Sequence, residues 1–166
     1  MRPLAAALAL GLTGGCAHVP AAGEDPWRIP ALELPSVGPE PFTPGQLEGR
    51  VVLVSFLSTW CFPCLSELPT LEALQRAHGE AGLQVVAIGV DREGRRVLEP
   101  FAYAYKLPFP LLVADEATRT GESRFGPVQA VPQGMLFGRD GRLVSAWRGP
   151  LSAGVLEAEI RRVLQR

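Results

Sequence analysis

Two long runs of apolar residues dominate the hydrophobic pattern of the chain. Residues 51–57 and residues 83–90 are mostly aliphatic or β-branched and do not alternate with polar side chains, as is typical of strands buried on both faces of a sheet. Between them, leucines recur at every third position and predict a helix over residues 62–78, which Gly79 ends. These leucines are Leu65, Leu68, Leu71 and Leu74. Strand, helix and strand in this order predict a right-handed parallel crossover.

Weaker patterns predict the remaining elements. Apolar residues at helical spacing favour a helix over residues 95–106, although Pro100 inside it should kink or shorten it. Asp140 and Gly141 predict a tight hairpin turn, and Ser152 is placed to cap a C-terminal helix. The other expected elements are strands at residues 32–34, 108–113, 134–138 and 143–147, a short helix at residues 116–125, and turns over most of residues 36–46.

These elements add up to an α/β fold, a central mixed β-sheet flanked by helices on both faces. A chain of 166 residues fits one domain, and its 47% apolar and 20% charged residues are those of a packed globular protein. The formal net charge is −1 and the cationic residues are dispersed. Because no basic field is present to attract phosphates, nucleic acid is not expected as a partner.

Residues 1–15 have the pattern of a signal peptide, with Arg2, an apolar block and small residues at the end. The block is shorter than the roughly 20 residues of a membrane-spanning helix. Small residues directly before Cys16 resemble the lipobox of bacterial lipoproteins, in which the cysteine is acylated, although Thr13 stands where Leu is usual. The alternative is a cleaved signal peptide with an incidental cysteine. Either interpretation predicts export to an oxidising compartment, with residues 16–30 as a flexible tether and residues 31–166 as the domain.

Cys61 and Cys64 stand at the start of the helix predicted over residues 62–78. A dithiol exchanges disulfides well when one sulfur is ionised and the other can resolve the mixed disulfide. The helix dipole stabilises an anion at Cys61 by up to about 2 kcal/mol, Pro63 is tolerated in the first turn, and Cys64 follows on the same face. Cys61 is therefore the expected nucleophile, Cys64 the resolving thiol, and the Cys61–Cys64 pair a redox-active disulfide.

A cysteine pair can also bind zinc or form a purely structural disulfide. A zinc site requires two further ligands, yet the only histidines are His18 in the tether and His78 about four helical turns away. A purely structural disulfide would close so short a loop that it stabilises little. No metal and no cofactor are therefore expected.

The motif around the cysteines resembles the TlpA/ResA group of membrane-anchored bacterial thioredoxin-like proteins, from about residue 34 to the C-terminus. The matching residues are Phe56-Leu57-Ser58-Thr59-Trp60-Cys61-Phe62-Pro63-Cys64, then Glu67-Leu68-Pro69, and later Val131-Pro132. The resemblance implies a thioredoxin-like fold.

The resemblance also implies roles for single residues. Pro132 would form a cis-proline loop that faces the sulfurs, where a substrate backbone pairs with Val131; the alternative is an ordinary trans proline. Trp60 would shield the sulfurs, or simply pack. Glu67 would move protons to or from the inner thiol, or be a plain acid on the helix surface. The residues expected to contact substrate are Trp60, Phe62, Pro63, Val131 and Pro132.

The sequence departs from the family pattern at two places. Thioredoxin has an acid six positions before its first cysteine, where this chain has Ser55, so Glu67 becomes the better proton carrier. After Pro132 the chain has Gln133-Gly134-Met135, where hydroxyl residues are frequent in the family.

The function expected from these features is an exported thiol–disulfide oxidoreductase on the periplasmic side, lipid-anchored to a bacterial membrane. It would reduce protein disulfides, with apocytochromes during cytochrome c maturation as one candidate, and take electrons from a membrane donor such as a DsbD/CcdA-type transporter. A disulfide oxidase or isomerase remains open, because potentials in this fold range from about −270 to about −120 mV.

Two more distant functions are less favoured. A peroxiredoxin expects Thr three residues and Pro seven residues before its nucleophile, and Ser58 and Val54 occupy those places. A thiol metal carrier of this fold usually has a histidine near the thiols, and none is near in the sequence.

Overall fold

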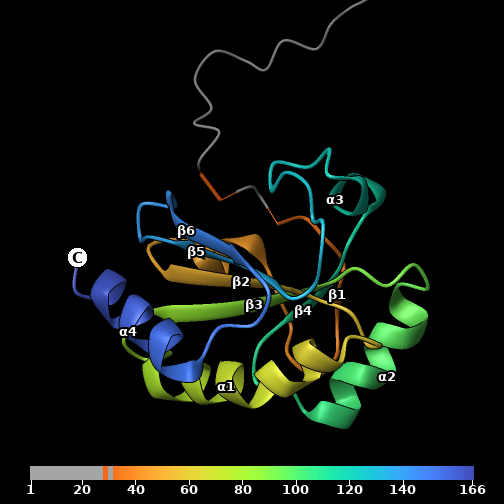
Figure 1. Cartoon of the computed structure of the whole chain (residues 1–166), viewed down its shortest axis with the longest axis horizontal. Coiled ribbons are helices and arrows are strands. Elements are labelled where there is room, and N and C mark those ends of the chain that lie inside the picture. Colours follow the sequence, from red (N-terminus) through yellow and green to blue (C-terminus); the bar gives the residue numbers. More distant parts are fainter. Residues whose placement is uncertain (1–27, 30–31) are drawn as a thin grey trace, which may run out of the picture.

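Six strands and four α-helices make up the domain (Figure 1), in a computed structural model that describes residues 28–29 and 32–166. The strands are β1 (Ser36–Val37), β2 (Val51–Leu57), β3 (Leu83–Gly89), β4 (Leu111–Val113), β5 (Gln133–Phe137) and β6 (Leu143–Arg148). The helices are α1 (Phe62–His78), α2 (Arg95–Tyr105), α3 (Glu116–Thr120) and α4 (Ala153–Leu164), with a 3₁₀ helix at Pro44–Leu47. The predicted signal peptide, Cys16 and nearly all of the predicted tether lie outside the described residues.

The strands form one mixed sheet in the order β1-β4-β3-β2-β5-β6. β2 is central: it pairs in parallel with β3 and antiparallel with β5. All seven residues of β2 are buried, which explains why its sequence is apolar throughout. α1, α2 and α4 cover one face of the sheet, and the short α3 with its flanking loops lies on the other (Figure 1). The predicted α/β class, a mixed sheet with helices on both faces, is confirmed.

Alternate side chains of β2 enter two different cores. Leu53 and Leu57 pack in the cluster shared with α1, α2 and α4. Val54 and Phe56 pack in the opposite cluster, which includes Phe125 from the loop that follows α3. A strand that serves both cores at once is held in place by both layers, and its C-terminal end is therefore a firm base for the loop that carries Cys61.

Several predicted elements differ from the structure, and of the strand expected at residues 108–113 only Leu111–Val113 forms. No strand forms at residues 32–34; the edge strand is β1, four positions later, and Leu32 is buried as a core side chain without joining the sheet. α3 ends at Thr120 because Gly121 adopts a left-handed conformation with φ 84°. Pro100 does not shorten α2, which runs from Arg95 to Tyr105 with the proline on its exposed side.

The predicted hairpin joins β5 to β6. Gly141 has φ 77°, which suits a glycine, and the side chain of Asp140 accepts a hydrogen bond from the Arg142 N–H at 3.0 Å. The two strands pair antiparallel with an irregularity between Leu136 and Phe137. β5 also pairs antiparallel with β2, with Gln133 opposite Phe56, so the start of β5 lies beside the C-terminal end of β2.

Candidate functional site

Cys61 occupies the N-cap of α1, directly before the first helical residue, Phe62. Its sulfur is bonded to that of Cys64, and the two Cα atoms are 5.2 Å apart. The N–H of Cys64 also donates to the Cys61 sulfur at 3.2 Å. An N–H of the first helical turn, which has no partner within the helix, therefore points at the Cys61 sulfur, an arrangement that would stabilise negative charge on that atom.

The disulfide is buried, whereas the aromatic residues on either side of Cys61 in the sequence are exposed. Cys61 is 4% exposed and Cys64 is 3% exposed, whereas Trp60 is 74% exposed and Phe62 is 77% exposed. Large apolar side chains that stay exposed and lie close together often mark a surface that contacts a partner.

The loop before β5 faces the sulfurs. The peptide bond between Val131 and Pro132 is cis, and Pro132 is buried. The carbonyl oxygen of Val131 lies 3.5 Å from the Cys61 sulfur, although the two residues are 70 positions apart in the chain. The structure thus brings together the two motifs on which the sequence resemblance depends.

A buried acid that sequence analysis did not single out anchors the loop between β2 and α1. Asp91, two positions beyond the end of β3, is 2% exposed. Its two carboxylate oxygens accept the Thr59 N–H at 3.1 Å each, and one of them accepts the Thr59 hydroxyl at 2.6 Å. In the same turn the N–H of Cys61 donates to the carbonyl of Ser58 at 3.0 Å. The parallel strands β2 and β3 end at the same edge of the sheet. An acid directly after the apolar run of residues 83–90 was therefore the sequence signal that could have indicated the contact between Asp91 and Thr59.

Replacing Thr59 by Val should therefore destabilise the domain. The substitution keeps the shape of the side chain but removes one hydrogen bond to a buried carboxylate, which costs about 1–3 kcal/mol. Urea denaturation of Thr59→Val and of the control Thr59→Ser, which keeps the hydroxyl, measures the difference. Equal stability of both variants and the wild type would show that the hydroxyl of Thr59 contributes nothing to the turn.

Glu67 lies on α1 one turn beyond Cys64 and is only 7% exposed, so it is not a plain acid on the helix surface. The N–H of Leu151, just before α4, donates to its Oε1 at 3.4 Å. Burial raises the pKa of the Glu67 carboxyl, and the Leu151 N–H offsets part of that rise. A carboxyl that keeps its proton to higher pH than usual, one turn from the inner thiol, is chemically suited to hold or release a proton there.

Glu67→Gln should change how stability depends on pH. Because the pKa of Glu67 is raised in the folded state, the folded protein binds more protons than the unfolded chain, and the free energy of unfolding falls as pH rises from about 4.5 through the raised pKa. The neutral Gln does not ionise, and its oxygen can still accept from Leu151. Urea denaturation between pH 4.5 and pH 8 should show the variant gaining on the wild type towards alkaline pH. A stability difference that stays constant with pH would contradict this account.

The departure from the family pattern after Pro132 has a steric reason at Gly134. A Cβ atom on Gly134 would lie 2.2 Å from the ring of Trp147 on the paired strand β6. The indole therefore occupies the space that a side chain on β5 would need. Gln133 and Met135 are both buried. Ser55, which replaces the acid of thioredoxin, is likewise buried within β2.

In the part of the chain that the structure describes, His, Cys, Asp and Glu side chains form no group of three or more that could bind a metal ion. None of the helices there has the length and apolar character needed to cross a bilayer.

A disulfide at the N-terminus of a helix, facing a cis-proline loop at the end of a mixed sheet, defines a thioredoxin-like arrangement. The chain belongs to the AhpC/TSA family, whose model matches residues 27–145. The predicted resemblance to the ResA group is confirmed by the thiol-disulfide oxidoreductase ResA of Bacillus cereus (strain ZK / E33L). This relative is 28% identical over 118 residues, which make up 71% of this chain and 66% of the relative, just under two thirds of its length.

Solved structures share the fold. A thiol-disulfide isomerase from Corynebacterium glutamicum aligns with a TM-score of 0.68 and 24% identity, over 82% of this chain and 97% of the other. A secreted disulfide oxidoreductase of Mycobacterium tuberculosis, homologous to DsbE of E. coli, aligns with a TM-score of 0.61 and 20% identity, over 78% of this chain and 96% of the other. At these identities the similarity establishes the thioredoxin-like architecture alone.

Proposed function

We propose that this protein is an exported reductase of protein disulfides. The observation that carries the proposal is the Cys61–Cys64 disulfide at the N-cap of α1, with the Cys64 N–H on the Cys61 sulfur and the Val131 carbonyl 3.5 Å away. These contacts support an anionic outer sulfur, an inner sulfur within bonding distance, and a backbone edge beside both where an extended substrate segment could lie.

In the reduced protein, the Cys61 thiolate attacks one sulfur of a substrate disulfide. The substrate S–S bond breaks, its other sulfur leaves as a thiolate and takes up a proton, and a mixed disulfide with Cys61 forms. Cys64 then loses its proton, for which Glu67 is the proposed acceptor, and attacks the Cys61 sulfur. The substrate leaves as a dithiol, and the two electrons it gained are those lost in forming Cys61–Cys64.

The residues beside the sulfurs are assigned to substrate contact in this proposal. Trp60 and Phe62 supply exposed aromatic surface, and Pro63, Val131 and Pro132 shape the approach to Cys61. A membrane donor of the DsbD/CcdA type would return the dithiol to its reduced form, and an apocytochrome c whose haem-binding cysteines are oxidised is the proposed substrate.

The direction of electron flow is tested by the reduction potential. Equilibration of the purified domain with glutathione or dithiothreitol buffers should give a value close to the −270 mV end of the range for this fold. A potential near −120 mV would instead identify a disulfide oxidase. The two ends differ by about 150 mV, or ~7 kcal/mol for two electrons, so the measurement separates them clearly.

The substrate is tested by trapping. In Cys64→Ser the second step cannot occur, so mixed disulfides with Cys61 should accumulate in the native host, and mass spectrometry names the partners. Recovery of apocytochromes, together with loss of c-type cytochromes in a deletion strain, is the expected result. Rapid consumption of peroxide by the same variant would indicate the peroxiredoxin activity that Ser58 and Val54 argue against.

The cellular location follows from the pattern of residues 1–15 and is tested separately. Fractionation of the host should find the wild-type protein in the membrane, held by lipid on Cys16, with the domain on the periplasmic side. Cys16→Ala should release the protein from the membrane or block its processing. A wild-type protein recovered entirely in soluble fractions would contradict the lipid anchor.

A further inference from the structure

A groove of about 310 Å³ opens beside the cysteines, between the turn that carries Trp60 and the helix α3. Trp60 and Val131, which flank Cys61, both line it, together with Val90 and Val128. Its size is at the lower end of the roughly 300–1,000 Å³ found for ligand pockets. Because the groove continues directly from the surface next to the sulfur, any chain bound over Cys61 would have neighbouring residues within reach of it.

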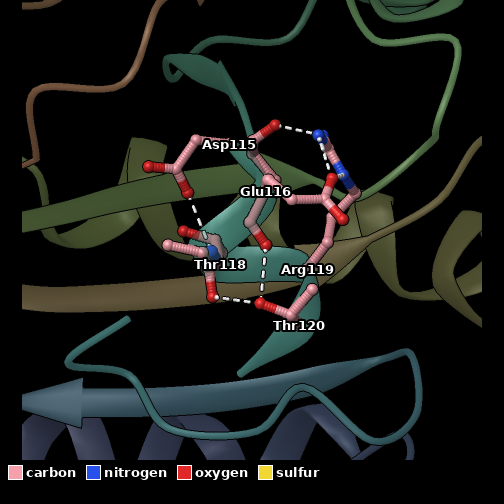
Figure 2. A network of polar contacts seen from close by, with 7 residues as sticks. Asp115, Glu116, Thr118, Arg119 and Thr120 are labelled. Atoms are coloured by element: carbon pink, nitrogen blue, oxygen red, sulfur yellow. Dashed lines mark hydrogen bonds and ion pairs between the residues drawn. The ribbon is translucent and has the colours of Figure 1, made fainter. Parts of the chain in front are cut away.

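The α3 wall of the groove is fixed by its own polar contacts (Figure 2). The side chain of Asp115 accepts the Thr118 N–H at 2.8 Å and so caps the first turn of α3. Arg119 donates to the Glu116 carboxylate at 2.9 Å. Glu116 and Arg119 both line the groove, but their charges are paired with each other. This wall therefore contributes a preformed shape with little net charge.

Arg92 lines the same groove from the turn between β3 and α2, directly after Asp91. Its side chain is exposed, and among the described residues it forms none of the ion pairs, in contrast to Arg119. The groove thus combines an apolar side, built by Trp60 and the valines, with one uncompensated positive charge.

We propose that this groove binds the residues that flank the reacting cysteine of the substrate, and that Arg92 selects substrates with an acidic side chain within two residues of that cysteine. The proposal rests on the proposed function, because that function places the substrate cysteine over Cys61. Two residues of extended chain span about 7 Å. An acidic side chain at this spacing therefore stays close to the Cys61 sulfur and to the groove beside it. A carboxylate is the side chain that complements a free guanidinium next to an apolar wall.

The experiment uses the reduced full domain and short peptides that carry one cysteine in a mixed disulfide with neutral 2-mercaptoethanol. The peptides are identical except for Glu, Gln or Lys at each of the two positions on either side of the cysteine. At low ionic strength the wild type should reduce the best-placed Glu peptide about fivefold faster than its Lys counterpart, the upper effect of one exposed ion pair. Arg92→Glu should reverse this order.

Arg96→Glu is the matched control, because Arg96 is exposed on α2 and does not line the groove. It changes the net charge by the same amount and should leave the peptide order as in the wild type. A preference that survives Arg92→Glu, or that Arg96→Glu alters equally, would overturn the proposal.

A small neutral substrate separates failure of this inference from failure of the proposed function. Bis(2-hydroxyethyl) disulfide has no residue that could enter the groove. If the wild type reduces it but shows no charge preference among the peptides, the groove is not a selective subsite. If the wild type does not reduce it at all, the proposed activity itself is wrong.

Discussion

Cys61→Ser should abolish turnover of protein disulfides, with a fall in kcat/KM of roughly 10³-fold or more, because it removes the only sulfur that the N-terminus of α1 activates. Cys64→Ser should behave differently. It keeps the nucleophile, so the first step still occurs, and the reaction stops at a mixed disulfide. Insulin reduction measures turnover, and mass spectrometry of the intact protein detects the trapped adduct.

The comparison of the two variants tests which cysteine attacks first. Geometry favours Cys61, since its sulfur accepts the Cys64 N–H at 3.2 Å and lies 3.5 Å from the Val131 carbonyl. An adduct that accumulates on Cys64 in the Cys61→Ser protein, at the wild-type rate of the first step, would exchange the roles of the two residues. Alkylation rates at neutral pH provide a second readout, because an activated Cys61 should react faster than a free cysteine.

Phe56→Ala should lower the free energy of unfolding by about 3–5 kcal/mol, the usual cost of deleting a buried aromatic ring. Phe56 is 0% exposed and packs edge-on against Phe125 with 5.2 Å between ring centroids. Since typical domains have only about 5–15 kcal/mol of stability, the loss is a large part of the total. Urea denaturation at constant m-value measures it.

The matched control is Phe62→Ala, the same substitution six positions later at a ring that is 77% exposed. It should cost less than about 0.5 kcal/mol of stability and instead slow the reduction of a protein substrate. If Phe62→Ala proved as destabilising as Phe56→Ala, the exposed position of the Phe62 ring beside the disulfide would be wrong.

The elements that sequence predicts well here are those with strong local patterns. β2 and α1 have the expected bounds because a continuous apolar run and a regular leucine spacing each permit one regular structure. The edge strand β1 was missed because two residues are too few to show a pattern. The end of α3 was misplaced because the conformation of Gly121 decides it.

The chemistry of the site was only partly accessible from sequence, for a different reason. The cysteine pair is a local motif and could be identified directly. The burial of Glu67 depends on the segment before α4 packing over it, and the contact of Asp91 with Thr59 spans 32 positions of the chain. The groove joins side chains from residues 60 to 131. Only the fold brings such residues together.

The two edge strands of the sheet, β1 and β6, affect whether the protein aggregates at high concentration. β1 offers only two residues of backbone to an incoming strand, while β6 is longer but pairs irregularly with β5 and ends at the exposed Arg148. Edge strands that are short, irregular or charged disfavour the pairing of strands from different molecules. The protein can therefore expose the aromatic rings of Trp60 and Phe62 without a matching tendency to form fibrils through the edges of its sheet.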